Sequence, residues 1–132
     1  MTEAAIATPL TPFERLGGHA TMAAIADRFY TLIETDPAYA QVRAMHGPDL
    51  TPIKASLASF LAGWSGGPRD WFTQRPGRCM MSIHAAYAIS PVAARQWAEA
   101  MDRTITDIAP PDGQLADTMR QLLSDMALAM GR

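Results

Sequence analysis

Residues 19–34, HATMAAIADRFYTLIE, decide the fold class of this chain. Apolar side chains recur along them at steps of three and four residues: Met22, Ile25, Phe29 and Leu32. This spacing places the side chains on one face of an α-helix. Asp36-Pro37 ends the helix, because a residue that precedes proline is disfavoured in the helical region. On the other side, Gly17-Gly18 separates it from a short turn of helix after Pro12.

Similar patterns predict three further long helices. One follows Thr51-Pro52, which pairs an N-cap hydroxyl with a proline at the first helical position, and it closes at Gly66-Gly67-Pro68. Another opens at Ser90-Pro91 with the same signal and stops at Pro110-Pro111. The last one follows Asp112-Gly113.

The remaining segments are shorter. Residues 38–48 form a connection that ends at Gly47-Pro48, and residues 69–78 are expected to be a loop. A helix of about ten residues is expected around His84. Valine, which favours strands, occurs only at positions 42 and 92, and no segment alternates as a strand does. The predicted fold class is therefore all-α.

Length and composition exclude several classes of protein. A chain of 132 residues makes one domain, with residues 1–11 expected as a flexible tail and residues 12–132 as the folded unit. The net charge of -2 argues against non-specific binding of nucleic acid. A single cysteine, Cys79, excludes an intrachain disulfide and an all-cysteine metal site. No apolar run is long enough for a membrane helix and no signal peptide is apparent, so a cytoplasmic location is expected.

The chemical motifs that can be read from spacing alone are few. The three histidines, His19, His46 and His84, are too far apart for a zinc-binding pair on one helical face. The Gly-Gly pairs lack the spacing of a phosphate-binding loop, and no serine or cysteine lies in a nucleophile motif. Without further information the chain is a helical globular domain.

A family resemblance adds a function. Residues 13–30 (FERLGGHATMAAIADRFY) and 55–68 (ASLASFLAGWSGGP), then His84 before AAYAI, Arg95-Gln96-Trp97 and Met101, resemble the group II truncated haemoglobins. The resemblance extends in order from Pro12 to about Met130. It implies a two-over-two helical sandwich around a b-type haem, with residues 12–132 as the globin domain.

The resemblance also implies roles for four residues. His84 matches the proximal ligand of the haem iron, a role that suits a neutral imidazole. Tyr30 and Trp97 match the distal residues that donate hydrogen bonds to bound dioxygen, which carries negative charge. His46 matches a variable distal position. Its side chain either contacts the gaseous ligand or faces the surface, and the resemblance leaves both alternatives open.

Other residues are expected to contact the haem. Ile53 stands where many globins carry a distal histidine or glutamine, and Leu57 follows one turn later, so neither can donate to the ligand. The full set of expected cofactor contacts is Ile53, Leu57, Phe60, Leu61, Trp71, Arg78, Met80, Met81, Ile89 and Met101.

The chain departs from the family just before the proximal histidine. Group II members carry arginines there that reach the haem propionates, whereas residues 79–83 are CMMSI. Arg78 is the first expected substitute, and Arg75, Lys54 or the indole N–H of Trp71 are alternatives. Arg69 is expected to be a solvated loop charge.

The resemblance leaves the physiological task open. The first hypothesis is a haem protein that reversibly binds dioxygen, carbon monoxide and nitric oxide, for oxygen transport or sensing. An alternative is a nitric oxide dioxygenase or a peroxidase-like enzyme, which needs a partner reductase because this chain has no flavin or nicotinamide domain. A third alternative is a haem-free helical interaction module.

Overall fold

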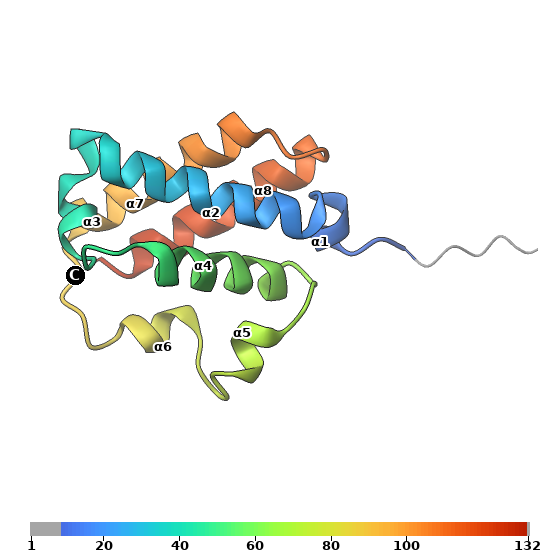
Figure 1. Cartoon of the computed structure of the whole chain (residues 1–132), viewed down its shortest axis with the longest axis horizontal. Helices are drawn as coiled ribbons and strands as arrows, with labels where there is room; N and C mark the ends of the chain where they lie inside the picture. The colour runs from blue at the N-terminus through green and yellow to red at the C-terminus, as the bar shows by residue number, and fades with distance from the viewer. Residues whose placement is uncertain (1–8, 132) are drawn as a thin grey trace, which may run out of the picture.

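The structure is a computed structural model that describes residues 9–131, and within this range it contains α-helices and one 3-10 helix but no strand (Figure 1). The elements are α1 (Pro12–Arg15), α2 (Gly18–Thr35), η1 (Pro37–Tyr39), α3 (Ala40–Ala44), α4 (Thr51–Trp64), α5 (Asp70–Thr73), α6 (Met80–His84), α7 (Pro91–Ile108) and α8 (Gly113–Ala129). The predicted all-α class is confirmed. Of the helices described, none is both long and apolar enough to cross a bilayer.

Four long helices form the body of the molecule. Helix α2 packs against both α4 and α7, and α7 packs in turn against α8 (Figure 1). Helix α5 packs against α4, and α3 joins α2 and α7 at the end of the body. The left-handed backbone of Gly17 (φ 110°) and Gly18 (φ 71°) allows the sharp turn between α1 and α2, since only glycine adopts it without strain.

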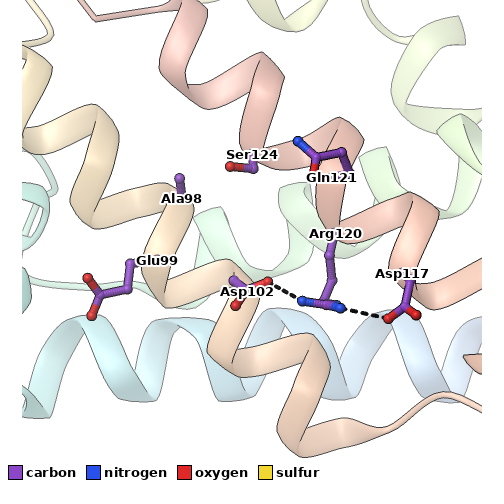
Figure 2. Close-up of a pocket in the computed structure, with 7 residues that line it drawn as sticks. All are labelled: Ala98, Glu99, Asp102, Asp117, Arg120, Gln121 and Ser124. Carbon is purple, nitrogen blue, oxygen red and sulfur yellow. Dashed lines mark hydrogen bonds and ion pairs between the residues drawn. The ribbon is translucent and has the colours of Figure 1, made fainter.

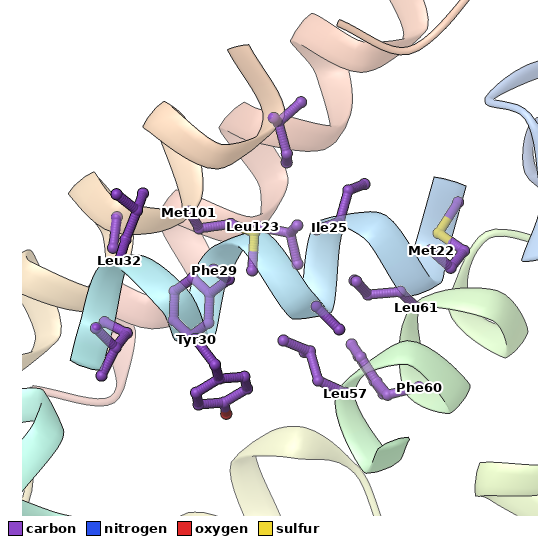
Figure 3. Close-up of a cluster of buried hydrophobic side chains, with 14 of the residues drawn as sticks. Met22, Ile25, Phe29, Tyr30, Leu32, Leu57, Phe60, Leu61, Met101 and Leu123 are labelled. Atoms are coloured by element: carbon purple, nitrogen blue, oxygen red, sulfur yellow. The ribbon is translucent and has the colours of Figure 1, made fainter. Parts of the chain in front are cut away.

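The apolar face predicted for residues 19–34 is the centre of the core. Met22, Ile25, Phe29 and Leu32 are all buried in α2, and they meet Leu57, Phe60 and Leu61 of α4 (Figure 3). Burial of one such side chain contributes about 1.5–3 kcal/mol to stability. The core therefore fixes α2 against α4 and α7, which are the elements that carry most of the predicted site residues.

One of the two predicted N-caps is confirmed. Ser90 accepts from the Ala93 amide at 3.0 Å. Asp112, for which no cap was predicted, is the N-cap of α8 and accepts from the Leu115 amide at 2.9 Å. The N-cap prediction for Thr51 is wrong by one residue, because Thr51 is the first helical residue of α4. The Thr51 amide instead donates to Asp49 Oδ1 at 3.0 Å, so Asp49, two residues earlier, satisfies the first backbone N–H of the helix.

The loop predicted for residues 69–78 contains a helix. Helix α5 forms there because Trp71 is buried against Phe60, with ring centroids 5.2 Å apart. The aromatic side chains of the segment supply the packing that a four-residue helix lacks on its own.

The helix of about ten residues predicted around His84 is also wrong. Helix α6 has five residues and ends at His84, after which the Tyr87 amide donates to the His84 carbonyl in a turn. Among the described helices α6 has no extensive contact with another, and a helix without a packed face does not propagate. Most of the predicted tail, residues 1–8, lies outside the described residues, while Thr11 is already fixed as the N-cap of α1.

Candidate functional site

Helix α6 carries His84 on a segment that stands apart from the body of the molecule. Cys79 and Ser82 form the cap that starts the helix, with the Cys79 amide donating to Ser82 Oγ at 2.8 Å. His84 is half-buried, and its ring lies 6.2 Å from that of Tyr87. Figure 1 shows α6 beside α4, on the side of that helix opposite α2. The imidazole is thus presented on a short helix with little protein packing of its own.

Tyr30 and Trp97 are brought together by Phe29. The Phe29 ring meets Tyr30 edge to face at 4.9 Å and meets Trp97 at 5.0 Å, so the three aromatic rings from α2 and α7 form one cluster. Figure 3 shows the Tyr30 hydroxyl directed away from the α2 axis, on the side of α2 where Leu57 lies. The sequence separation of Tyr30 and Trp97 hides this proximity, which the packing of α2 on α7 creates.

The two polar groups of this cluster are available as donors. Within residues 9–131, neither the Tyr30 hydroxyl nor the Trp97 indole N–H has a hydrogen-bond partner, and no fully enclosed side-chain polar atom lacks one. Both groups therefore border open space. Burial raises the pKa of the Tyr30 phenol, so the hydroxyl keeps its proton and remains a donor.

His46 reaches the same cluster from the segment before α4. Its ring lies 5.5 Å from Tyr30 in an edge-to-face contact, and its Nδ1 lies 2.8 Å from the Val42 carbonyl oxygen. Because a carbonyl only accepts, Nδ1 must carry a proton, and in the neutral ring Nε2 has the lone pair.

A cleft of about 430 Å³ opens beside His46. It is lined by Met45, His46, Gly47, Asp49, Leu50, Pro52, Ile53, Ser56 and Arg75. The cleft joins two predicted site residues, His46 and Ile53, to Ser56, which the sequence reasoning missed. A signal for Ser56 existed, since it lies three residues after Ile53 and residues at that spacing share a helix face.

A second cleft, of about 200 Å³, lies between α7 and α8 and contains no predicted site residue. Its lining residues are Ala98, Glu99, Asp102, Asp117, Arg120, Gln121 and Ser124 (Figure 2). Arg120 bridges Asp102 and Asp117 in it, so its central cation is already paired.

The other predicted cofactor contacts divide into two groups. Five are buried apolar residues of the core: Leu57, Phe60, Leu61, Ile89 and Met101. Trp71 is buried as well, and its indole N–H donates to Ser56 Oγ at 3.3 Å. Arg78 and Met81 are exposed, whereas the side chain of Met80 lies outside the described part. Their contact with a cofactor stays a prediction.

The residues around α6 fit a haem. An apolar disc needs apolar side chains to cover it. Large exposed ones are present at the cleft beside His46 (Met45 and Ile53) and on α6 and the turn after it (Met81 and Tyr87). A haem iron needs an axial ligand, and the imidazole of His84 is a side chain of the kind that serves. A gaseous ligand with negative charge needs donors, which Tyr30 and Trp97 offer, since neither has a hydrogen-bond partner in the described part of the chain.

Comparison with known proteins points to one family. Residues 11–131 match the family described as bacterial-like globin. The structure is similar to the cold-adapted truncated haemoglobin of Pseudoalteromonas haloplanktis TAC125, with 30% identity, a TM-score of 0.86, and coverage of 93% of this chain and 98% of that one. It is also similar to the group II 2-on-2 haemoglobin of Agrobacterium tumefaciens, with 26% identity, a TM-score of 0.88, and coverage of 97% and 98%. The haemoglobin of Chloroflexus aurantiacus has 30% identity and a TM-score of 0.83, with coverage of 94% and 99%.

Proposed function

The chain belongs to the bacterial-like globin family, and on this premise we propose that it is a b-type haem protein that reversibly binds dioxygen and other diatomic gases. Proteins of this family bind haem and gaseous ligands. The observation that carries the proposal is a pair of donors, the Tyr30 hydroxyl and the Trp97 indole N–H, whose rings both contact Phe29 and which have no hydrogen-bond partner among the described residues.

His84 would hold the haem iron through a ring nitrogen. The haem, when bound, supplies an iron centre that takes up diatomic gases reversibly. A b-type haem is attached only by such a ligand and by packing, and the single cysteine of this chain rules out a Cys-x-x-Cys-His attachment motif. Met81 and Tyr87, which flank His84 on the α6 side, would be covered by the macrocycle.

Tyr30 and Trp97 would select ligands that carry charge. A hydrogen bond to a charged group contributes about 1.5–3 kcal/mol, and dioxygen gains negative charge when it binds whereas carbon monoxide stays nearly apolar. The side chains of Ile53 and Leu57 have no donor, so Tyr30 and Trp97 would donate the hydrogen bonds to the ligand. Compared with a pocket that has no donors, this pocket should therefore release dioxygen more slowly, whereas the release of carbon monoxide should differ little.

The absorption spectrum of the purified protein tests this function. We expect a strong Soret band that shifts on reduction and shifts again when carbon monoxide is added. A protein that carries no haem after expression with haem precursors, and that does not take up added hemin, would instead be a haem-free helical module. Repeated evacuation and readmission of dioxygen separates reversible binding from oxidation of the iron. The spectrum of the dioxygen complex should disappear and return in each cycle if binding is reversible.

A further inference from the structure

We propose that Arg75 and Ser56 form the subsite that holds a carboxylate of the bound haem, inside the cleft beside His46 and Ile53. The inference rests on the proposed function, because the haem propionates are the carboxylates in question. Such a subsite would replace the arginines that are expected before His84 and that residues 79–83 lack.

Arg75 is positioned by Trp71, and among the described residues its guanidinium forms no ion pair with an acidic side chain. Its guanidinium carbon lies 4.7 Å from the centroid of the Trp71 ring, and its Nη1 donates to the Trp71 carbonyl at 3.2 Å. Trp71 is 1% exposed, so the ring on which Arg75 stacks is packed into the core. In the described part of the chain no acidic side chain pairs with Arg75, which leaves most of its five N–H donors for a ligand.

Ser56 adds a second donor in the same cleft. Its Oγ accepts from the Trp71 indole N–H at 3.3 Å, so its own hydroxyl hydrogen remains to be donated. Trp71 thus orients both groups, one through its carbonyl and ring face and the other through its indole N–H. A planar guanidinium beside a hydroxyl suits a carboxylate, which accepts through two oxygens.

The other basic residues near the site are less well placed. Lys54 Nζ is paired with Asp27 Oδ1 at 3.3 Å, and Arg78 is exposed and does not line the cleft. Arg69 stacks on Phe72 at 4.2 Å and also lies outside the cleft lining. Apart from His46, Arg75 is the one basic side chain among the described residues that line this cleft.

The single acidic residue that lines the cleft directs the carboxylate toward Arg75. Asp49 accepts from the Thr51 amide at 3.0 Å, and this bond together with the Thr51 hydroxyl lowers the pKa of its carboxyl. Asp49 therefore stays ionised and repels an anion. A propionate in the cleft is attracted to the Arg75–Ser56 end.

The rate of haem transfer to an excess of apomyoglobin tests the subsite. Arg75→Leu should release haem about tenfold faster than the wild type, and Ser56→Ala should release it faster by a smaller factor. Arg69→Leu is the matched control, because Arg69 also stacks on an aromatic ring and donates to a backbone carbonyl, that of Gly63 at 3.2 Å. The control should leave the rate unchanged.

Reconstitution with haem dimethyl ester distinguishes a carboxylate contact from packing. The ester has no charged propionate, so Arg75→Leu and wild type should release it at equal rates, as should Ser56→Ala. An Arg75→Leu effect that persists with the ester would show that Arg75 acts only through Trp71, and the subsite would be refuted. Equal release of natural haem by wild type and Arg75→Leu would also refute the subsite. So would a result in which Arg78→Leu, and not Arg75→Leu, accelerates haem release.

Two further outcomes keep the test decisive. If Arg75→Leu does not fold, Ser56→Ala with haem and its ester carries the same comparison, and no difference between the two cofactors overturns the proposal. If the wild-type chain takes up no hemin at all, the proposed function fails, and the subsite fails with it. Haem uptake with no effect of either substitution overturns the subsite alone.

Discussion

The rings of Tyr30 and His46 meet edge to face, with centroids 5.5 Å apart and planes inclined by 76°. The bond from His46 Nδ1 to the Val42 carbonyl leaves Nε2 of the neutral ring as an acceptor. Neutral His46 therefore cannot donate to a gaseous ligand through Nε2. Nε2 can only accept a hydrogen bond, and of the Phe29, Tyr30 and Trp97 rings it is that of Tyr30, which carries a hydroxyl donor, that contacts His46.

This tautomer predicts the sign of the His46→Phe effect. Removal of an acceptor that competes for the Tyr30 hydroxyl should leave dioxygen release unchanged or make it slower. Stopped-flow release of dioxygen at pH 8 measures the effect. Release that becomes faster in His46→Phe would mean that His46 donates directly to the ligand, and the tautomer assignment would be wrong.

Trp97→Phe should accelerate dioxygen release by about one to two orders of magnitude, because a hydrogen bond to a charged group contributes about 1.5–3 kcal/mol and each 1.4 kcal/mol is about a factor of ten. Carbon monoxide release should change much less. Stopped-flow release rates for both gases give the comparison. Equal acceleration of the two gases would show that Trp97 is a steric gate and not a donor.

Tyr30→Phe should make the protein more resistant to alkali. Burial raises the pKa of Tyr30, so the folded state keeps the phenolic proton at a pH where the unfolded chain loses it. The contribution of Tyr30 is complete below the ordinary tyrosine pKa of about 10 and declines as the pH rises above it. Urea unfolding between pH 9 and 11 should show a shallower decline in Tyr30→Phe. The exposed Tyr87 offers the control Tyr87→Phe, and an identical decline in all three proteins would contradict the burial of an ionisable hydroxyl at position 30.

Asp112→Ala should lower the melting temperature near neutral pH and have less effect in acid. The Leu115 amide, and then the Arg15 guanidinium, lower the pKa of the Asp112 carboxyl. A lowered pKa means that the stabilisation is present above the ordinary carboxyl range and is lost as the pH falls through the lowered value. Melting curves from pH 7 to pH 2 should therefore converge for wild type and variant. Asp125→Ala, at an exposed position of the same helix, is the control, and a gap that stays constant with pH would contradict the cap.

Local patterns predicted the helical body well. The periodic residues Met22, Ile25, Phe29 and Leu32 are all buried, Ser90 is the N-cap of α7, and the last helix follows Asp112. These features depend on neighbours within one or two turns, which spacing reveals. The resemblance likewise pointed to Tyr30 and Trp97, which the structure brings to one aromatic cluster.

Features that depend on distant packing were not predictable in this way. The length of α6 is set by the lack of a packed face, and no local pattern reports which faces are packed. Arg75 and Ser56 line the same cleft, and each forms a hydrogen bond with Trp71, which is 15 positions from Ser56 in the sequence. The sequence analysis ranked Arg78 above Arg75 because Arg78 is closer to His84 along the chain, whereas Arg75 and not Arg78 lines the cleft beside His46.

The ferrous absorption spectrum of His84→Gly, with and without added imidazole, tests the central claim that His84 holds the haem iron. We expect the variant to retain haem poorly and to show a displaced Soret band, because its axial ligand is missing. Millimolar imidazole should then enter the vacated space and restore the wild-type band. A His84→Gly protein whose haem content and Soret band equal those of the wild type without imidazole would contradict the claim.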